Sequence, residues 1–481
     1  MIDLKDLREN PQKYAEGCRK KGSGVDIPRL VELDARLRTL RTEQETLRAE
    51  QNRLAKETGP QIGKLQGQLK SAQGPERDAL QKQIDEIKSR PQQLKAKIEA
   101  IEPEIARIEP ELHAMLLSVP LPPDDDVPVG TSSDDNVERE RWAPDNWDWK
   151  KSFEQNRGFT PRNHLELVRD LKLADFERGV KLSGSRSYVL TGDGMRLHQA
   201  VLRFAMDMMV GKGFEPISVP VIVREEAMVG TGFFPAGREQ AYHINESQRQ
   251  HADDPEAKSK GQDLYLTGTG EVGLMGLHMD EILDEASLPL RYCTVSTCFR
   301  REAGAAGKDT AGLYRIHQFD KVEQVVICRA DEQESRRWHR EMIAYVQELL
   351  RALELPHRLL QCCTGDLGPK NADMIDVECW MPGRGAIGAD GVPAGDFGET
   401  HSASRLYDYQ CRRLNMRYRP SGEGASASSK PATVFCHSLN NTVAASPRIL
   451  IPILEMHQQK DGTVRVPKAL VPYVGKEVVG T

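Results

Sequence analysis

A repeat of leucine and isoleucine every three to four residues constrains the N-terminal quarter of the chain more than any other feature. Apolar side chains at this spacing form one stripe along a helix and build the seam of a coiled coil. The first run is Leu30, Leu33, Leu37, Leu40, Leu47 and Leu54, and the second is Leu80, Ile84, Ile87, Leu94, Ile98, Ile101, Ile105, Ile108, Leu112 and Met115. Glycines and prolines over residues 59–75 separate the two runs, so the sequence predicts an antiparallel helical hairpin.

Three prolines complicate the second helix of this hairpin. Pro91 falls on a seam position, and Pro103 and Pro110 lie further along the same run. Each removes a backbone hydrogen bond from a helix interior, so we expect the second helix to be kinked or segmented. At 1.5 Å per residue each helix would be roughly 40–55 Å long, too long to be covered by a globular body. The hairpin is therefore expected to form an arm.

The charge of this arm differs from that of the whole chain. Residues 29–99 contain 15 Lys or Arg and 11 Asp or Glu, whereas the chain of 481 residues has a formal charge of −6. The basic residues near the expected tip are Arg53, Lys56, Lys64 and Lys70. A solvated coiled coil that dimerises would explain the pattern, and so would a basic rod that grips a phosphate backbone. Charge alone leaves both readings open.

Composition indicates a cytoplasmic protein of two or three domains. The net charge of −6 argues against a wholly basic nucleic-acid-binding protein. Its apolar runs fall short of the roughly 18 residues that span a bilayer, and the N-terminus lacks the apolar core of a signal peptide. Nine cysteines without a C-x-x-C pair fit reduced thiols.

Helix and strand signals alternate after residue 160. The predicted helices cover residues 195–210, 271–285 and 331–353, and the predicted strands cover residues 292–302, 313–328, 357–362 and 374–382. Residues 246–262 are polar and without periodicity, as in a surface insertion. This pattern favours an α+β fold with an antiparallel sheet. The chain has neither a G-x-x-x-x-G-K-[ST] motif nor a dinucleotide fingerprint, so nucleotide binding would need another structure.

The stretch over residues 291–328 has charges where core strands would have apolar residues. It predicts two strands joined by a small-residue loop over residues 303–312. Side chains two apart share a face of a strand. The residues expected to share a face are Arg300 with Glu302 on the first strand, and Arg315, His317, Phe319, Lys321 and Glu323 on the second. An ordinary surface hairpin would also carry such charges, so this feature by itself leaves the function open.

Several segments together resemble seryl-tRNA synthetase, a class II aminoacyl-tRNA synthetase. Besides the arm, they are LSGSRSYVLTGDGMRLHQA, GTGFFP, LYLTGTGEV, CFRREAGAAGKDTAGLYRIHQFDKVE, LLQCCTGDLG, GETHSASRLYDYQCRRLNMRY and HSLNNTVAASPRILIPILE. The arginine-bearing hairpin resembles class motif 2, and the segment ending in Arg448 resembles motif 3. Residues 214–223 occupy the motif 1 position, which forms the dimer interface in the family. The resemblance implies a six- to eight-stranded antiparallel class II catalytic sheet with flanking helices, preceded by an antiparallel coiled-coil hairpin.

This resemblance implies a reaction in two steps. ATP and L-serine give seryl-adenylate and pyrophosphate, and serine is then transferred to the 3′-terminal ribose of tRNA(Ser) and, where present, tRNA(Sec). It also implies a tRNA-binding arm over residues 1–117 with its basic tip on the tRNA, a linker over residues 118–160 and a catalytic domain over residues 161–481. The protein would be a homodimer through the motif 1 region. Attack of a carboxylate on the α-phosphate builds negative charge, which arginines and Mg²⁺ can stabilise.

The family's ATP motifs fall on residues suited to phosphate, adenine or metal contact. They are Arg300, Arg301, Glu302, Phe319, Glu399, Thr400, His401, Ser402 and Arg448. Arg300 is expected on the α-phosphate and Arg448 on the γ-phosphate, as the catalytic pair. Glu302 would meet the adenine, and Phe319 would stack on it. Glu399 and Ser402 would hold the Mg²⁺ that accompanies ATP.

The family's serine motifs fall on a second set of residues. They are Thr269, Gly270, Glu271, Arg300, Glu323, Asn440 and Thr442. Glu323 is expected to bind the substrate amino group, and Thr442 occupies the position of a serine-contacting hydroxyl residue. The chain departs from the family pattern at Gly270, where alanine is usual, and at Thr400-His401, where isoleucine-serine is common. Motif 3 has Thr442 in place of the serine of many bacterial members, and Pro447 stands immediately before its arginine.

Two other functions are compatible with parts of this pattern. An amino acid:carrier-protein ligase would share the activation site, but such relatives lack the long arm. A non-catalytic synthetase paralogue would be expected to lose the charged residues of the site, and Arg300, Glu302, Glu323 and Arg448 are all present. His317 is expected to be structural, and the cysteines and histidines show no convincing zinc-ligand spacing.

Overall fold

The computed structural model divides into two compact units. It describes residues 1–244, 263–305, 311–388, 391–421 and 432–480, so the polar stretch predicted as an insertion lies outside the described residues. The arm unit comprises residues 4–15 and 24–119, and the sheet unit comprises residues 1–3, 16–23 and 120–481. The expected domain boundaries stay a prediction. None of the helices that the structure describes combines the length and apolarity needed to cross a lipid bilayer.

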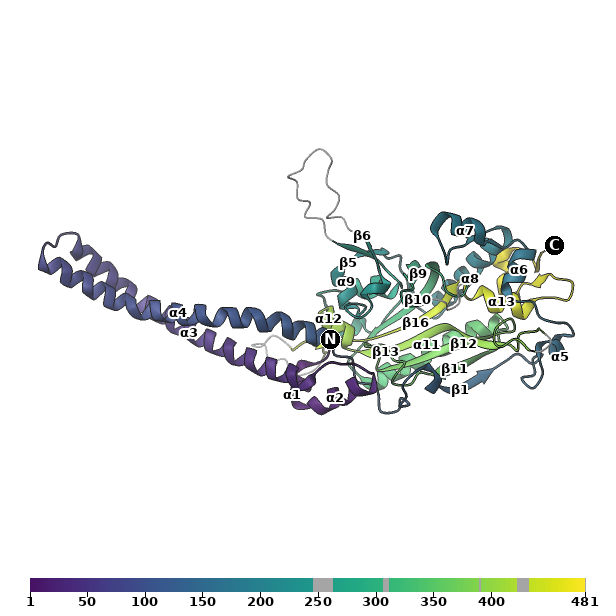
Figure 1. Ribbon diagram of the computed structural model, residues 1–481, viewed down its shortest axis with the longest axis horizontal. Coiled ribbons are helices and arrows are strands. Elements are labelled where there is room, and N and C mark those ends of the chain that lie inside the picture. Colours follow the sequence, from purple (N-terminus) through teal and green to yellow (C-terminus); the bar gives the residue numbers. More distant parts are fainter. Residues whose placement is uncertain (245–262, 306–310, 389–390, 422–431, 481) are drawn as a thin grey trace, which may run out of the picture. The chain divides into compact units, whose positions relative to one another are not determined.

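Two long helices lie side by side along the arm unit (Figure 1). Its helices are α1 (Leu4–Glu9), α2 (Pro11–Lys20, which ends in the sheet unit), α3 (Ile27–Leu69) and α4 (Pro75–Ser118). The seam is buried inside the hairpin at Leu30, Leu33, Leu37 and Leu40 of α3 and at Ile84, Leu94, Ile98, Ile108, Leu112 and Leu116 of α4. Ion pairs such as Arg36–Glu104 at 2.7 Å and Arg90–Glu50 at 2.9 Å join the helices in antiparallel order. The predicted coiled-coil hairpin is confirmed.

The expected break over residues 59–75 is shorter than predicted, and the expected segmentation of the second helix is wrong; its kinking stays a prediction. Helix α3 continues through Pro60 to Leu69, and α4 runs through Pro91, Pro103 and Pro110 as one element. Only residues 70–74 form the turn. A proline costs a helix about 3 kcal/mol, but apolar side chains buried on both sides of each α4 proline compensate for the lost hydrogen bond. Tertiary packing, rather than propensity, supplies most helix stability in proteins.

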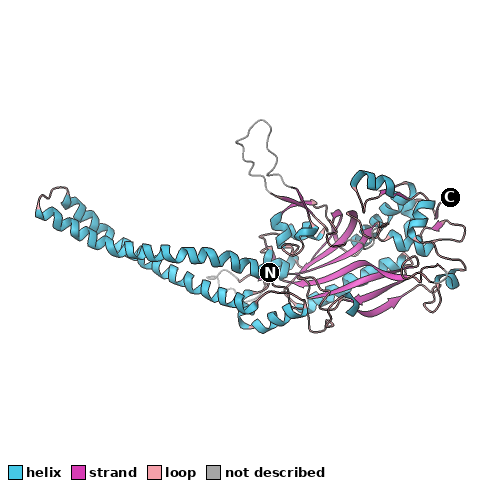
Figure 2. Cartoon of the chain, in the orientation of Figure 1, coloured by secondary structure: helices cyan, strands magenta, loops and turns pink. Residues whose placement is uncertain are grey.

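An eight-stranded sheet forms the centre of the sheet unit (Figure 2). In spatial order its strands are β1 (Val137–Trp142), β11 (His357–Gln361), β12 (Asp373–Met381), β13 (Asp396–Tyr407), β16 (His437–Ser446), β10 (Gln318–Cys328), β9 (Leu290–Phe299) and β4 (Glu215–Pro216). All neighbours are antiparallel except β4 and β9. Helices α8 (Gly192–Gly211) and α11 (Glu332–Ala352) pack on one face and build the core with it. The prediction of an α+β fold with an antiparallel class II sheet is confirmed.

Shorter elements complete the sheet unit. They are η1 (Ser133–Asp135), α5 (Phe153–Arg157), α6 (His164–Asp170), β2 (Ala174–Asp175), α7 (Phe176–Ser183), β3 (Val189–Leu190), β5 (Ile222–Arg224), α9 (Glu225–Gly230), η2 (Arg238–Gln240), β6 (Tyr242–Ile244), β7 (Leu264–Leu266), α10 (Glu271–Gly276), β8 (Ile282–Asp284), η4 (Glu285–Ser287), α12 (Tyr409–Arg413), β14 (Arg417–Arg419), β15 (Val434–Phe435), α13 (Leu450–His457), β17 (Val464–Arg465), η5 (Lys468–Leu470), α14 (Val471–Val474) and β18 (Val478–Val479). All nine cysteines lie among the described residues, buried and without disulfides.

Several predicted bounds are corrected. The helix expected over residues 271–285 ends at Gly276, and β8 follows it. The two strands of the charged hairpin end at Phe299 and begin at Gln318, so Arg300, Glu302 and Arg315 lie outside the ladder. Glu302 has a φ of 53°, which breaks the alternation on which the strand prediction rested. The stretch expected as a linker over residues 118–160 supplies strand β1, and its Trp147 is buried in the core.

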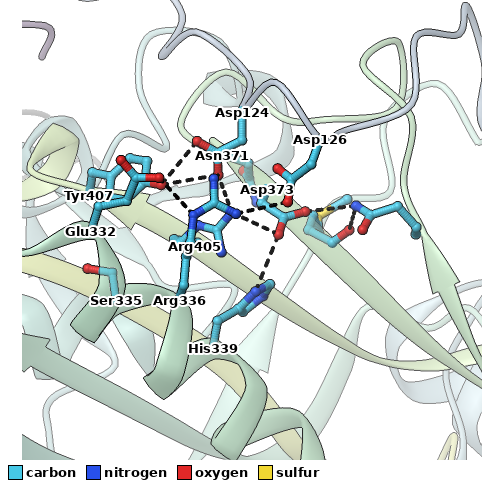
Figure 3. A network of polar contacts seen from close by, with 12 residues as sticks. Asp124, Asp126, Glu332, Ser335, Arg336, His339, Asn371, Asp373, Arg405 and Tyr407 are labelled. Carbon is cyan, nitrogen blue, oxygen red and sulfur yellow. Dashed lines mark hydrogen bonds and ion pairs between the residues drawn. The ribbon is translucent and has the colours of Figure 1, made fainter. Parts of the chain in front are cut away.

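A buried polar network fixes residues 120–126 to the sheet (Figure 3). Arg405 of β13 pairs with Asp124 and, at 3.1 Å, with Asp373 of β12. His339 of α11 lies 3.5 Å from the Asp373 carboxylate. Burial alone would raise the pKa of Asp373, but its hydrogen bond with His339 and the charge of Arg405 hold that pKa well below the usual range.

We predict that Asp373→Asn lowers the free energy of unfolding by about 2 kcal/mol at neutral pH, because a charged partner of buried Arg405 is lost. The pKa of Asp373 is lower in the folded protein than in the unfolded chain, so its ionised carboxylate stabilises the fold above the unfolded Asp pKa of about 3.9. This stabilisation is lost as the pH falls from that value toward the folded-state pKa. The difference from wild type should therefore shrink below about pH 4. Urea unfolding as a function of pH measures this. Asp170→Asn, in an exposed ion pair with Arg169, is the control, and equal pH dependence in both variants would contradict the prediction.

Candidate active site

A pocket opens on the sheet face opposite α8 and α11. Phe319 and Lys321 of β10 line it. The alternate residues face the other way: Asp320 binds His198 of α8, and Val322 lies in the core. The full lining is Arg300, Glu302, Tyr314, Ile316, Phe319, Lys321, Glu399, Thr400, His401, Thr442, Ala445 and Arg448. The predicted sharing of one face by Phe319, Lys321 and Glu323 is confirmed, since Lys321 also binds Glu323.

Two arginines from distant parts of the sequence line this pocket. The guanidinium of Arg300 lies 5.2 Å from the centre of the Phe319 ring, and its Nε donates to Gly268 O at 3.3 Å. Arg448 follows β16, and its Nε donates to Tyr314 O at 2.9 Å. Arg448 Nη1 also donates to Glu399 O at 3.2 Å, so both guanidinium groups are oriented by backbone carbonyls while they line one cavity. Such donors suit a polyphosphate or a carboxylate.

Glu302 and Arg315 form an ion pair at the rim of the pocket. Their side chains meet at 2.7 Å, and both also line an adjoining cavity that contains Arg300 and Arg448. His317 Nδ1 donates to Arg300 O at 2.9 Å, while the Arg300 N–H donates to His317 O at 2.9 Å. His317 therefore closes the hairpin beside Arg300, in agreement with its expected structural role.

Next to the arginines lie two buried carboxylates, Glu271 of α10 and Glu323 of β10. They are 2% and 0% exposed. Asn440 Nδ2 donates to both, at 3.1 Å to Glu271 Oε2 and 3.0 Å to Glu323 Oε1. Thr442 Oγ1 lies 3.5 Å from Glu323 Oε2. Each carboxylate has its own ammonium partner, Lys370 for Glu271 at 2.5 Å and Lys321 for Glu323.

The glycine at position 270 follows from the packing of this site. A Cβ there would lie 2.5 Å from Thr294 Cγ2 and 2.9 Å from Ser296 Oγ, both on β9. Only glycine lets the loop before α10 approach the sheet so closely. Thr269 on this loop receives a hydrogen bond from Lys321 Nζ at 2.8 Å and accepts one from Glu271 N at 3.2 Å. The predicted triplet Thr269, Gly270 and Glu271 is thus assembled with Glu323.

A bulge in β13 changes the alternation of its side chains beside the pocket, whose lining includes Glu399, Thr400 and His401 but not Ser402. The pairing register with β12 shifts between Glu399 and His401, so Glu399 and Ser402 are half-buried while Thr400 and His401 between them are buried. Burial lowers the pKa of His401 to about 3, so this imidazole is neutral. A carboxylate and a hydroxyl on one side of a strand are hard oxygen donors that fit Mg²⁺. The residues present therefore fit the expected metal.

Not every predicted residue joins this site. Arg301 is exposed and absent from the pocket lining, and its backbone N–H donates to Gln240 O at 2.9 Å. The basic residues of the arm belong to the other unit, where all of them are exposed; they are Arg53, Lys56, Lys64 and Lys70.

Sequence reasoning missed several residues that the structure brings to the site. Lys370 and Gln410 both bind Glu271 Oε1, at 2.5 and 2.7 Å, and Tyr314 contacts Arg448. No sequence signal marks Lys370 or Gln410, because they lie far from Glu271 along the chain. A cluster of Cys362, Asp366 and Asp376, with ligand atoms within 4.8 Å of one another, was also missed. Burial and the charge of Glu399 raise the pKa of Asp376.

Two family models match the chain. The model of the seryl-tRNA synthetase N-terminal domain matches residues 1–122. The model of the class II tRNA synthetase core domain (G, H, P, S and T) matches residues 255–457.

Curated proteins and solved structures give the same result. The serine–tRNA ligase of Deinococcus radiodurans is 43% identical over 372 residues, which cover 77% of each chain. The crystal structure of seryl-tRNA synthetase from Pyrococcus horikoshii complexed with ATP has a TM-score of 0.76 and 36% identity, covering 100% of this chain and 99% of that one. The Naegleria fowleri cytoplasmic serine–tRNA ligase in complex with AMP has a TM-score of 0.77 and 28% identity, covering 100% and 98%.

Proposed function

The chain belongs to the seryl-tRNA synthetase family of class II aminoacyl-tRNA ligases, and from that premise we propose how its residues divide the activation of serine and its transfer to tRNA(Ser). The observation that supports the proposal best is the pair of buried carboxylates, Glu271 and Glu323, beside a pocket lined by Arg300 and Arg448. An amino acid and a nucleotide can lie side by side there. The amino acid:carrier-protein ligase and the non-catalytic paralogue are not favoured.

Serine binds through its three polar groups. Glu323 accepts the ammonium group, because a cation entering a buried site needs a fixed anion. The hydroxyl group meets Thr442 and the carboxylate pair, so alanine would leave buried polar groups unpaired and bind weakly. Arg300 binds the serine carboxylate and positions it beside the α-phosphate of ATP. Because serine is held in this way, its carboxylate oxygen attacks the α-phosphorus of ATP at short range. The orientational entropy of serine has already been lost on binding, so the attack costs little more of it.

ATP binds across Arg300, Phe319 and Arg448. The adenine stacks on Phe319, with Glu302 at its edge, and Arg448 holds the γ-phosphate. Arg300 stabilises the negative charge that develops on the α-phosphate as pyrophosphate leaves. Glu399 and Ser402 would hold Mg²⁺, which supplies further positive charge to the phosphates when bound. Arg301 has no direct role in this proposal, because its side chain lies outside the pocket lining.

We predict that Arg300→Ala reduces serine-dependent ATP–pyrophosphate exchange by at least about 10³-fold, because a charge-stabilising group of the transition state is lost. Exchange by wild type should also require Mg²⁺ and stop when a chelator is added. The control is Arg329→Ala, an arginine at the far end of β10 that pairs with Glu334 at 2.9 Å. A folded wild-type protein without serine-dependent exchange would sink the proposed function.

The arm is proposed to bind tRNA through its exposed basic residues. A dimerising coiled coil is the less suitable alternative, because the apolar seam is already filled inside the hairpin. The basic residues Arg53, Lys56, Lys64 and Lys70 are exposed. Their side chains are therefore free to contact the phosphate backbone of a tRNA.

We predict that replacing Arg53, Lys56, Lys64 and Lys70 together by alanine raises the KM for tRNA by about tenfold or more and leaves pyrophosphate exchange unchanged. The salt dependence of tRNA binding should also weaken, because fewer counterions are released. Aminoacylation of total tRNA at several salt concentrations measures both effects. Replacing Lys151, Arg169 and Lys460, which are exposed in the sheet unit, serves as the control. Equal loss of exchange would contradict this division of roles.

A homodimer is proposed through the motif 1 region. Large apolar side chains are exposed around it, namely Leu182 at 77%, Val180 and Val295 at 48%, Ile222 at 47% and Met195 at 44%. Strand β4 pairs with β9 only at Tyr292 and Cys293, so among the described residues the rest of this β9 edge has no strand neighbour. Exposed apolar side chains beside an open sheet edge are typical of an interface.

The cytoplasmic location of the protein stays a prediction.

We predict that Leu182→Asp with Val295→Asp converts a dimer into a monomer, because two charges would be buried without partners at the interface. Sedimentation equilibrium measures the mass. Val129→Asp, at an apolar residue that is 68% exposed elsewhere, should leave the dimer intact. A monomeric wild-type protein would refute the interface.

A further inference from the structure

Glu271 is held by side chains from three segments that lie far away in the sequence. Lys370 Nζ and Gln410 Nε2 both donate to Glu271 Oε1, at 2.5 and 2.7 Å, while Asn440 binds the other oxygen. Glu271 is 2% exposed, so water cannot replace these donors. Removal of Lys370 would leave a buried negative charge beside Glu323 without its cation, which strongly disfavours the observed arrangement.

Lys21, near the start of the sheet unit, binds the backbone of the loop that carries Lys370. Lys21 Nζ donates to Gly368 O at 3.0 Å and to Asn371 O at 2.5 Å, the carbonyls on either side of Lys370. Burial lowers the pKa of Lys21 to about 7, in keeping with an amine withdrawn from bulk water. Lys21 therefore fixes the backbone from which Lys370 reaches Glu271.

A second N-terminal segment grips the same loop. Leu121 N donates to Pro369 O at 2.8 Å, and Asp124 N donates to Ala372 O at 2.9 Å. Asp124 is itself anchored by Arg405 and by Tyr407, whose hydroxyl lies 3.0 Å from Oδ1 (Figure 3). Residues 368–372 are thus tied to the sheet unit's residues 16–23 and 120–124, between which the chain forms the arm unit.

The other partner of Glu271 has a similar support. Gln410 lies on α12, and Arg412 of the same helix pairs with Asp3 at 2.6 Å. Asp3 belongs to the sheet unit as well. Both segments that hold Glu271 Oε1 are therefore contacted by the N-terminal residues of that unit.

We propose that Lys370 is a positioning residue for the serine subsite and that Lys21 acts through it. The inference rests on the proposed function, because it assigns Glu271 to serine. Lys370 holds the Glu271 carboxylate in place beside Glu323, and Lys21 holds the loop of Lys370. The contacts described for Arg300, Phe319 and Arg448 do not involve residues 368–372 or Lys21. Lys370 reaches the adjoining cavity through the Phe233 ring, whose centre lies 4.1 Å from Lys370 Nζ, so we expect a smaller effect on ATP than on serine.

The test compares KM values in ATP–pyrophosphate exchange for the full chain. Lys370→Met should raise the KM for serine about tenfold or more and change the KM for ATP less than about twofold, while Lys370→Arg should recover most of the loss. Lys21→Met should raise the KM for serine about three- to tenfold. Because both residues act on one loop, the double variant should be little worse than Lys370→Met alone.

The matched control is Lys476→Met. Lys476 pairs with Asp193 at 2.5 Å and is 32% exposed at its side chain, but it lies outside the site. It should leave both KM values unchanged, and thermal unfolding of every variant shows that the protein is folded. If Lys370→Met does not fold, the serine KM of Lys21→Met still decides the question.

Two outcomes would overturn the inference. One is a serine KM within about twofold of wild type in Lys21→Met and, where it folds, in Lys370→Met; the other is an equal rise of both KM values. A wild-type protein without serine-dependent exchange would overturn the proposed function and this inference together. An active enzyme with unchanged serine affinity in these variants overturns the inference alone.

Discussion

Two carboxylates buried side by side are the constraint on which the rest of the site depends. Glu271 and Glu323 share the amide of Asn440, and neither is more than 2% exposed. Charges removed from water at this proximity repel each other and must be compensated by cations or protons. Lys370 and Lys321 supply the cations, so the charges of these four side chains sum to zero. This neutrality is compatible with binding a zwitterion such as serine.

Each of these charged groups is carried by a different element. Glu323 lies on β10, Asn440 on β16, Glu271 at the start of α10 and Lys370 in the loop before β12. The two central strands supply a rigid floor, and the loop supplies a cation whose position depends on further hydrogen bonds. The site therefore has two parts. Strands β10 and β16 carry Glu323 and Asn440, whereas the loop of Lys370 is held in place by hydrogen bonds from Lys21 and Leu121.

Backbone irregularities place residues that a regular strand would turn away. The β13 bulge lets Glu399 and Ser402, three residues apart, be accessible from one side of the strand. The positive φ of Glu302 directs its side chain to Arg315 beyond the end of β9. In the arm the reverse holds, because packing keeps α4 continuous through three prolines that its sequence suggested would interrupt it.

Sequence patterns were sufficient to predict the class of fold, the coiled-coil hairpin and the shared face of Phe319, Lys321 and Glu323. These follow from local periodicity, which is set by the 3.6-residue turn of a helix and the two-residue alternation of a strand. The sequence also placed Thr269, Glu271, Asn440 and Arg448 in one site, although only through the resemblance to a known family.

Tertiary structure alone decided how that site is neutralised and supported. Lys370, Gln410 and Lys21 have no periodicity or motif that links them to Glu271, because their contacts join residues far apart in the chain. The exposure of Arg301 and the continuity of α4 were likewise decided by surroundings that a local pattern does not contain. Periodicity reports which side of an element is apolar, whereas the partner of a buried charge is determined only when the elements pack together.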